Sequence, residues 1–280
     1  MEQIAMQTLA KGFDFVENPR WHEGRLWFVD FFQEKVMTMD AQGHGTDVVH
    51  VPGRPSGMGW LPDGSLLVVS MTNHQVMRYK DGRLSVHADL DHLVQDDLND
   101  MLVDERGRAY VGNFGCKLFE GGEAPKPTCL VMIDPDGKPK VVAEDLVFPN
   151  GMVIIGGGTL VVAESFAMRL TAFDLQKDGT LTSRRVWASL GEYTPDGIAL
   201  DAKGGIWVSA FVQGAFLRVE EGGAITHQAL VAPCRAVACA LGGADGRTLY
   251  GCVFDGELHD VGQIKGRSRL DAAKVPIGAI

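Results

Sequence analysis

The sequence predicts an all-β protein, a six-bladed β-propeller whose four-stranded antiparallel blades surround a central channel. One motif recurs at intervals of roughly 40–50 residues, a repeat length typical of propeller blades. Short apolar runs alternate with Asp-Gly and related turn dipeptides, as in a series of hairpins. Glycine is abundant, with 35 residues in a chain of 280, as many tight turns require.

Each copy of the motif starts with a small or polar residue, continues through an apolar strand and ends at a glycine. The copies start at Glu17, Ser56, Asn99, Asn150 and Asp196. The glycine stands eight positions after the start in all but the first copy, which is one residue shorter. A weaker sixth copy runs through 238–246. Three further strands follow each start, so we expect six blades in one domain that spans 1–280.

The N-terminal segment 4–9 is expected to add a strand to the last blade and so to close the ring. Closure removes the open sheet edges that would otherwise pair with other chains.

Equivalent positions on the innermost strands of a propeller converge on the channel axis. Glu17, Asn99, Asn150 and Asp196 are therefore expected to meet there. Two carboxylates and two carboxamide oxygens form a hard, oxygen-rich site for one divalent metal ion, and Ca²⁺, Mg²⁺, Mn²⁺, Zn²⁺ and Fe²⁺ all stay open. Four protein ligands leave coordination positions open, which is typical of catalytic sites.

The alternative is that these residues only form turns, because Asn-Gly and Asp-Gly are common turn dipeptides. Other Asp-Gly pairs already serve the outer turns, however, and a turn role does not explain why one column of the repeat holds all four residues. The joint pattern therefore favours metal binding. Ser56, in the same column, is expected to lie behind the ligands at most.

Four separated motifs resemble the SMP-30/gluconolactonase/LRE-like family: Glu17-Asn-Pro-Arg-Trp21, Leu98-Asn99-Asp100, Phe148-Pro-Asn150-Gly151 and Pro195-Asp196-Gly197. The resemblance implies a propeller with one divalent metal in the channel that hydrolyses lactones. It implies that Glu17, Asn150 and Asp196 are metal ligands. It also implies that Asn99 is a fourth ligand or a water-mediated contact that helps to hold the substrate, and that Asp196 is the general base.

The chemistry expected of this site is the opening of a lactone ring, by a metal that polarises the carbonyl or activates water. Asp196 either accepts a proton from the water or attacks the carbonyl itself, and the sequence leaves both routes open. Two other functions stay open. One is a binding or regulatory propeller with a structural metal, and the other is a promiscuous phosphotriesterase-type hydrolase.

The substrate is expected to be less polar than a sugar lactone. Relatives that act on sugar lactones carry an Arg and an acidic residue where this chain has Asp97 and Lys117. Apolar candidates for the pocket are Phe114, Phe148, Phe166 and Phe211, with Trp21 near the metal. Such rings suit an apolar or aromatic lactone or ester, although phenylalanines in blades often belong to the core.

Polar residues that follow second strands of the blades are further candidates for substrate binding. His74, Asn113 and Glu164 occupy such positions in the second, third and fourth repeats. They are expected to face the mouth of the channel, where loops on a rigid scaffold often carry function. The loop 119–127 is expected to lie over one mouth.

Charge and composition exclude several partners. The formal net charge of −10 argues against nucleic acid. No apolar run reaches about 18 residues, which argues against a membrane span. The first residues lack the basic and apolar parts of a signal peptide, so a cytoplasmic protein with a small-molecule substrate is expected. The oligomeric state is not predicted.

Five cysteines, an odd number without metal-type spacing, are expected to be reduced in that compartment. Cys116 and Cys129 flank one loop, which leaves a disulfide between them as an alternative.

Overall fold

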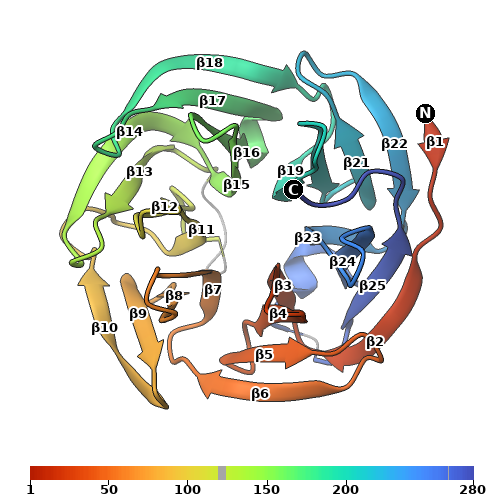
Figure 1. Ribbon diagram of the computed structural model, residues 1–280, viewed down its shortest axis with the longest axis horizontal. Coiled ribbons are helices and arrows are strands. Elements are labelled where there is room, and N and C mark those ends of the chain that lie inside the picture. The colour runs from red at the N-terminus through yellow and green to blue at the C-terminus, as the bar shows by residue number, and fades with distance from the viewer. Residues whose placement is uncertain (119–123, 264) are drawn as a thin grey trace.

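The structure is a computed structural model that describes residues 1–118, 124–263 and 265–280. Six sheets surround one axis, as the sequence predicts (Figure 1). The only helical segments in the described ranges are two short 3-10 turns, η1 (Ser165–Ala167) and η2 (Leu258–Asp260). No helix in the described part of the chain is long and apolar enough to span a membrane.

The blades follow one another in chain order, and each runs from an inner strand to an outer strand. The inner strands are β3 (Val16–His22), β7 (Pro55–Trp60), β11 (Leu98–Val103), β15 (Pro149–Ile155), β19 (Pro195–Leu200) and β23 (Arg235–Gly242). The second strands are β4 (Arg25–Asp30), β8 (Leu66–Ser70), β12 (Ala109–Asn113), β16 (Thr159–Glu164), β20 (Ile206–Ala210) and β24 (Thr248–Phe254). The third strands are β5 (Lys35–Met39), β9 (Gln75–Lys80), β13 (Pro127–Ile133), β17 (Arg169–Leu175), β21 (Ala215–Val219) and β25 (Ser268–Lys274). The outer strands are β6 (Gly45–His50), β10 (Arg83–Asp89), β14 (Pro139–Val147), β18 (Leu181–Ser189), β22 (Ile225–Leu230) and β2 (Gln7–Phe13).

The N-terminal segment closes the ring. Strand β2 pairs antiparallel with β25 and forms the outer strand of the last blade, so the expected closure is found, with the strand starting and ending later than the expected 4–9. Strand β1 (Glu2–Gln3) pairs in parallel with β22 and adds a fifth strand to the neighbouring blade. The N-terminus therefore ties two blades together (Figure 1).

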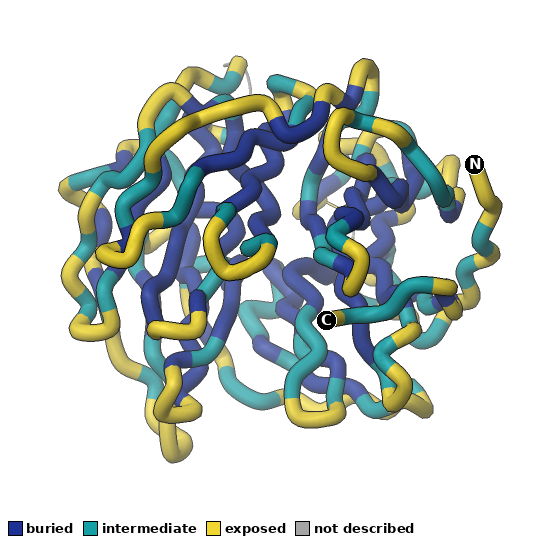
Figure 2. Tube along the Cα trace, turned by 45° about the horizontal axis from the view of Figure 1, so that its top comes forward, coloured by how far each residue is buried: buried dark blue, intermediate teal, exposed yellow. Residues whose placement is uncertain are grey.

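Burial follows the distance from the axis. All residues of the second strands β8 and β20 are buried, whereas most of the outer strand β6 is exposed (Figure 2). Inner and second strands are covered on both faces by the neighbouring blades, which explains why they are nearly continuous apolar runs.

The inner strands share a local irregularity at the motif's first position. In β11, β15 and β19 the pairing register shifts just where Asn99, Asn150 and Asp196 lie, and β3 has a shift that begins at Glu17. Irregularities of this kind bend a strand and re-aim a side chain. The Asn-Gly and Asp-Gly pairs of the motif are therefore parts of strands and not hairpin turns.

A second glycine, directly after the motif's first residue, lies where neighbouring inner strands approach closely. A Cβ atom at Gly57 would lie 2.1 Å from the backbone nitrogen of Met101, and one at Gly151 would lie 2.5 Å from that of Ile198. Both neighbours are backbone atoms of the next blade, so they cannot move aside as the end of a side chain can. At these two positions packing between blades therefore requires glycine.

Replacing this glycine should destabilise the ring. We expect Gly57→Ala to lower the free energy of unfolding by about 3 kcal/mol, the upper end of the usual cost of overpacking, because backbone atoms take the clash. Gly158→Ala is the control, since Gly158 is exposed and its Cβ would meet nothing within 4 Å. Denaturant unfolding of the three proteins measures the effect. Equal stabilities of the two variants would contradict this account.

Candidate functional site

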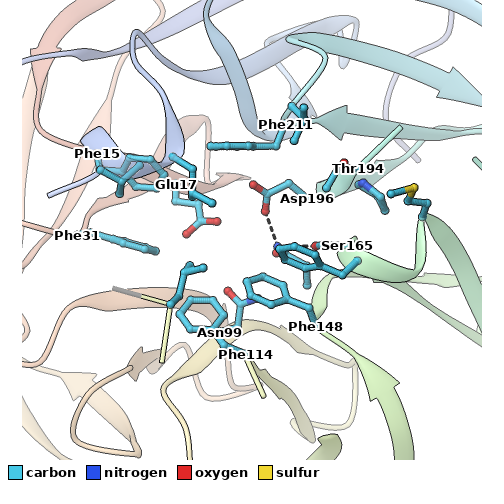
Figure 3. Close-up of a pocket in the computed structure, with 18 residues that line it drawn as sticks. Phe15, Glu17, Phe31, Asn99, Phe114, Phe148, Ser165, Thr194, Asp196 and Phe211 are labelled. Atoms are coloured by element: carbon cyan, nitrogen blue, oxygen red, sulfur yellow. Dashed lines mark hydrogen bonds between the residues drawn. The ribbon is translucent and has the colours of Figure 1, made fainter. Parts of the chain in front are cut away.

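Four inner strands bring the expected ligands together. Glu17, Asn99, Asn150 and Asp196 line one pocket at the channel axis. Figure 3 shows the carboxylates of Glu17 and Asp196 pointing toward one another, with the amide of Asn99 below them. The first three side chains are buried, and Asp196 is partly exposed at the pocket floor.

Hydrogen bonds fix how the two carboxamides are turned. Asn150 Nδ2 donates to Asp196 Oδ1 at 2.5 Å and to Ser165 Oγ at 3.3 Å. Asn99 Nδ2 donates to the carbonyl of Pro149 at 3.0 Å. The amide nitrogens are thus used within the protein, which leaves the carboxamide oxygens available to the channel.

Two oxygens at this site are buried without a hydrogen-bond partner, namely Glu17 Oε2 and Asn150 Oδ1. Buried polar atoms are normally paired, and an unpaired buried acceptor costs about 1–3 kcal/mol. Both atoms are acceptors only, so a cation would satisfy them.

The raised pKa values of the two carboxyl groups indicate that the site lacks a compensating positive charge. Burial raises the pKa of Glu17 well above its ordinary range, and the negative charges of Asp196 and Asp100 raise it further. Burial likewise raises the pKa of Asp196, with a further contribution from Asp100 and an opposing hydrogen bond from Asn150. Both carboxylates would be more favourable as anions beside a bound cation.

A third carboxylate, Asp100, has its own partners. Arg20 Nη2 lies 3.2 Å from Asp100 Oδ1, and Asn18 also donates its side-chain amide to this oxygen. Asn18 Oδ1 in turn accepts from the backbone nitrogen of Met58 at 2.8 Å. Arg20 therefore balances Asp100, and the charges of Glu17 and Asp196 are left for a divalent ion.

The residues present thus fit a divalent metal ion. Among the described residues, no group of three or more His, Cys, Asp or Glu side chains is placed to hold a metal. The fit rests instead on the mixed set of two carboxylates and two carboxamides, a donor set typical of hard cations.

The walls of the pocket are apolar. Six phenylalanines line it, and the only charged residues among its described lining are Glu17 and Asp196. The residues other than the four expected ligands are Phe15, Phe31, Phe114, Leu118, Phe148, Ser165, Phe166, Met168, Thr194, Pro195, Phe211, Val212, Leu258 and Val261. The expected Phe114, Phe148, Phe166 and Phe211 are all part of this set.

Phe148 holds a central place in the wall. Its φ of 57° is in the left-handed region, which is unusual for a bulky residue and often marks a functional position. Its ring stacks on that of Phe114 with centroids 4.8 Å apart, and it contacts Phe166 at 5.1 Å. Asn150 follows two residues later, so one short segment supplies both wall and candidate ligand.

The structure places Asn113 and Glu164 outside the pocket. Asn113 donates to the carbonyl of Cys129 and accepts from Thr128, and Glu164 is fully buried and bonded to Arg169 and Thr171. Their neighbours Phe114, Ser165 and Phe166 line the pocket instead. Successive side chains of a strand point to opposite faces, so a shift of one residue changes the side that a residue faces.

His74 and Trp21 also lie away from the pocket. His74 pairs with the exposed Asp91, with 3.0 Å between Nδ1 and Oδ1, and no described residue of its blade lines the pocket. Trp21 stacks on Tyr250 with centroids 5.5 Å apart, four residues along β3 from Glu17. Trp21 is not part of the described pocket lining, so its expected place near the metal stays a prediction.

Asp97 and Lys117 likewise are not part of the described lining, and neither is Ser56. The expectation for the loop 119–127 falls largely outside the described residues, since 119–123 are not described. Leu118, directly before them, does line the pocket. None of the five cysteines, Cys116 and Cys129 included, forms a disulfide within the described part of the chain.

Comparison with known proteins gives the family. A family model described as SMP-30/Gluconolactonase/LRE-like region matches residues 15–252. The chain belongs to this family. Regucalcin of Xenopus laevis is 24% identical over 251 residues, which cover 87% of this chain and 84% of that protein.

Two solved structures show the same fold. Regucalcin from Agrobacterium tumefaciens, described as a calcium-binding protein, has a TM-score of 0.79 at 18% identity. The matched region covers 100% of this chain and 99% of that chain. A gluconolactonase of Xanthomonas campestris has a TM-score of 0.75 at 21% identity, over 97% and 89% of the two chains. At these identities the likeness concerns the fold alone.

Several residues that line this SMP-30/gluconolactonase-type site cannot be recognised from the repeated sequence motif. Phe15, Phe31, Leu258 and Val261 line the pocket from loops or strand ends whose sequence looks like ordinary core or turn. Asp100 could have been noticed, because it stands where the other three longer copies of the motif carry glycine.

Removing divalent ions should make stability fall with rising pH. Glu17 and Asp196 have raised pKa values, so the folded metal-free protein keeps protons that the unfolded chain releases above about pH 4.5. We expect a loss of up to about 1.4 kcal/mol per pH unit for each retained proton, from about pH 4.5 up through the raised pKa values. Denaturant unfolding of chelator-treated protein across pH measures it.

The variant Asp196→Asn should flatten this dependence, because it removes one of the two carboxyl groups. Asp245→Asn is the control, since Asp245 is exposed, pairs with Lys274 and has a lowered pKa. If the metal-free protein instead gains stability as the pH rises through this range, the raised pKa values assigned to Glu17 and Asp196 are wrong.

Proposed function

We propose that this protein is a divalent-metal-dependent hydrolase of uncharged, apolar lactones or related esters. The observation that carries the proposal is the contrast between the floor and the walls of one pocket. Two carboxylates and two carboxamides meet at the floor, and six phenylalanines line the walls. Membership of the SMP-30/gluconolactonase family and a calcium-binding structural relative support a metal and an ester substrate.

The wall chemistry favours an apolar substrate. A polyhydroxylated sugar lactone needs several hydrogen-bond partners, but Ser165 and Thr194 are the only polar residues of the described lining besides the four candidate ligands. That lining also holds no Lys, Arg or His to pair with an anionic substrate. Apolar walls with a few polar groups are typical of sites for small, largely apolar ligands.

Glu17, Asn99, Asn150 and Asp196 would hold the metal, which supplies Lewis-acid polarisation of the ester carbonyl. Asp196 serves as general base: its free carboxylate oxygen takes a proton from the attacking water as the water oxygen bonds to the carbonyl carbon. The ring C–O bond then breaks, and the proton passes to the leaving alkoxide oxygen. Asn150 orients Asp196 through the 2.5 Å hydrogen bond, and the aromatic walls exclude bulk water.

The variant Asp196→Asn should lower kcat by about 10²–10⁴-fold, the usual contribution of a general base. Its fold should persist, because the carboxamide is isosteric. Asp245→Asn, an exposed position, should keep the activity of the parent. If Asp196→Asn keeps full activity on a confirmed substrate, Asp196 is not the general base.

The variant Glu17→Gln should weaken metal binding first, because it removes one of two charges that offset the ion. We expect the dissociation constant to rise at least about tenfold, since even residues that only orient metal ligands cost this much. Titration calorimetry with Ca²⁺ and Mn²⁺ measures it, with the exposed Glu23→Gln as control. Unchanged affinity would show that Glu17 is not a ligand.

The function itself is tested with metal-stripped protein and a panel of sugar lactones, simple and alkyl-substituted γ- and δ-lactones, aromatic lactones and one phosphotriester, with each divalent ion added back. Metal-dependent turnover of apolar lactones above sugar lactones is expected. Stoichiometric metal binding without turnover would instead favour a binding protein with a structural metal. Turnover of the phosphotriester alone would favour a phosphotriesterase.

A further inference from the structure

The mouth of the pocket is edged by exposed apolar side chains. Phe166, Met168, Val212 and Leu258 all line the pocket, and between 40% and 53% of each residue's surface is exposed. We call these four side chains the apolar rim. They come from three successive blades: from η1 and the residue after it, from the β20–β21 loop, and from η2.

Such exposure is concentrated at this mouth. Nine large hydrophobic residues are exposed in the described part of the chain, and two of these are the terminal residues Met1 and Ile280. Four of the other seven form the apolar rim. Single exposed hydrophobics are ordinary, but a group around a pocket marks a binding surface.

The apolar rim continues the wall of the pocket without a polar break. The exposed ring of Phe166 contacts Phe148, which is buried and stacks on the buried Phe114. Phe114 and Phe148 lie beside the floor with Asn99 and Asp196 (Figure 3). An apolar path therefore runs from the candidate metal ligands to the outer surface.

We propose that the apolar rim binds an extended apolar tail of the substrate, while the ester group lies at the floor. The substrate class is then an uncharged lactone or ester that carries a long alkyl substituent. The reaction assumed here rests on the proposed function, but the binding of the tail does not.

Two other occupants fit the surface less well. A stable interface between two copies of the chain buries about 800 Å² on each partner, more than four loop side chains provide. Membrane surfaces favour Lys and Arg around an apolar patch, but the two arginines beside the rim residues Met168 and Val212 are paired within the protein, Arg169 with Glu164 and Arg235 with Glu257.

A series of γ-lactones with unbranched alkyl substituents of increasing length tests the tail. Each added methylene that becomes buried should raise kcat/KM about fourfold, until the tail passes the apolar rim. Beyond that length the increase should stop, because further carbons lie in water.

Variants of the apolar rim test which residues cause kcat/KM to rise with the length of the tail. In Val212→Ser and Leu258→Ser the ratio of kcat/KM for long over short members should fall at least about fivefold, because apolar contact is lost only at the end of the tail. Matched controls are Val186→Ser and Leu230→Ser, equally exposed residues on the outer strands β18 and β22. Both controls should keep the ratio of the parent.

Binding of the corresponding γ-lactams, which resist hydrolysis, is measured in parallel by calorimetry. Affinity that rises with tail length and falls in the two rim variants supports the tail site even if no lactone is hydrolysed, in which case only the proposed function fails. Hydrolysis without any dependence on tail length overturns the tail site alone. Self-association or binding to phosphatidylcholine vesicles that is lost in the rim variants, without dependence on tail length, also overturns it.

Discussion

The close approach of the inner strands around one axis is the constraint on which the rest of the structure depends. A Cβ atom at Gly57 or Gly151 would meet the backbone of the next blade within 2.5 Å, so these two copies of the motif have no room for a side chain at the second position. Asn150, directly before Gly151, lies at a register shift of its strand and lines the pocket. Packing between blades and the aim of the candidate ligands are thus two results of one local geometry.

The same convergence creates an electrostatic problem at the centre. The charges of Asp196 and Asp100 raise the pKa of the buried Glu17, and the charge of Asp100 also raises the pKa of Asp196. Arg20 and Asn18 satisfy Asp100, and they do so from the strand that carries Glu17. The charge that is left matches a divalent cation, so a bound metal would stabilise the fold as well as serve chemistry.

The walls determine what this centre can act on. Stacked rings of Phe114 and Phe148 lie directly beside the polar floor. Apolar walls exclude water, and in a region of low dielectric the charges at the floor act more strongly on a polarised carbonyl than they would in water. In the proposed hydrolase the strands provide the reacting groups, and the loops of five blades set the size and polarity of the pocket.

The sequence by itself determined the six repeats, the ring closure and the column that holds Glu17 and its partners, because the repeat period and the alternation along strands are local properties that symmetry carries to one axis. It did not determine which loop residues line the pocket. Phe114, Phe148, Phe166 and Phe211 were expected there and are found, but Asn113 and His74 were also expected and lie outside, whereas Leu258 and Val261 line the pocket without having been expected. Only the tertiary structure decided this, because loops do not follow the repeat and the twist of each strand end sets which of two adjacent side chains faces the channel.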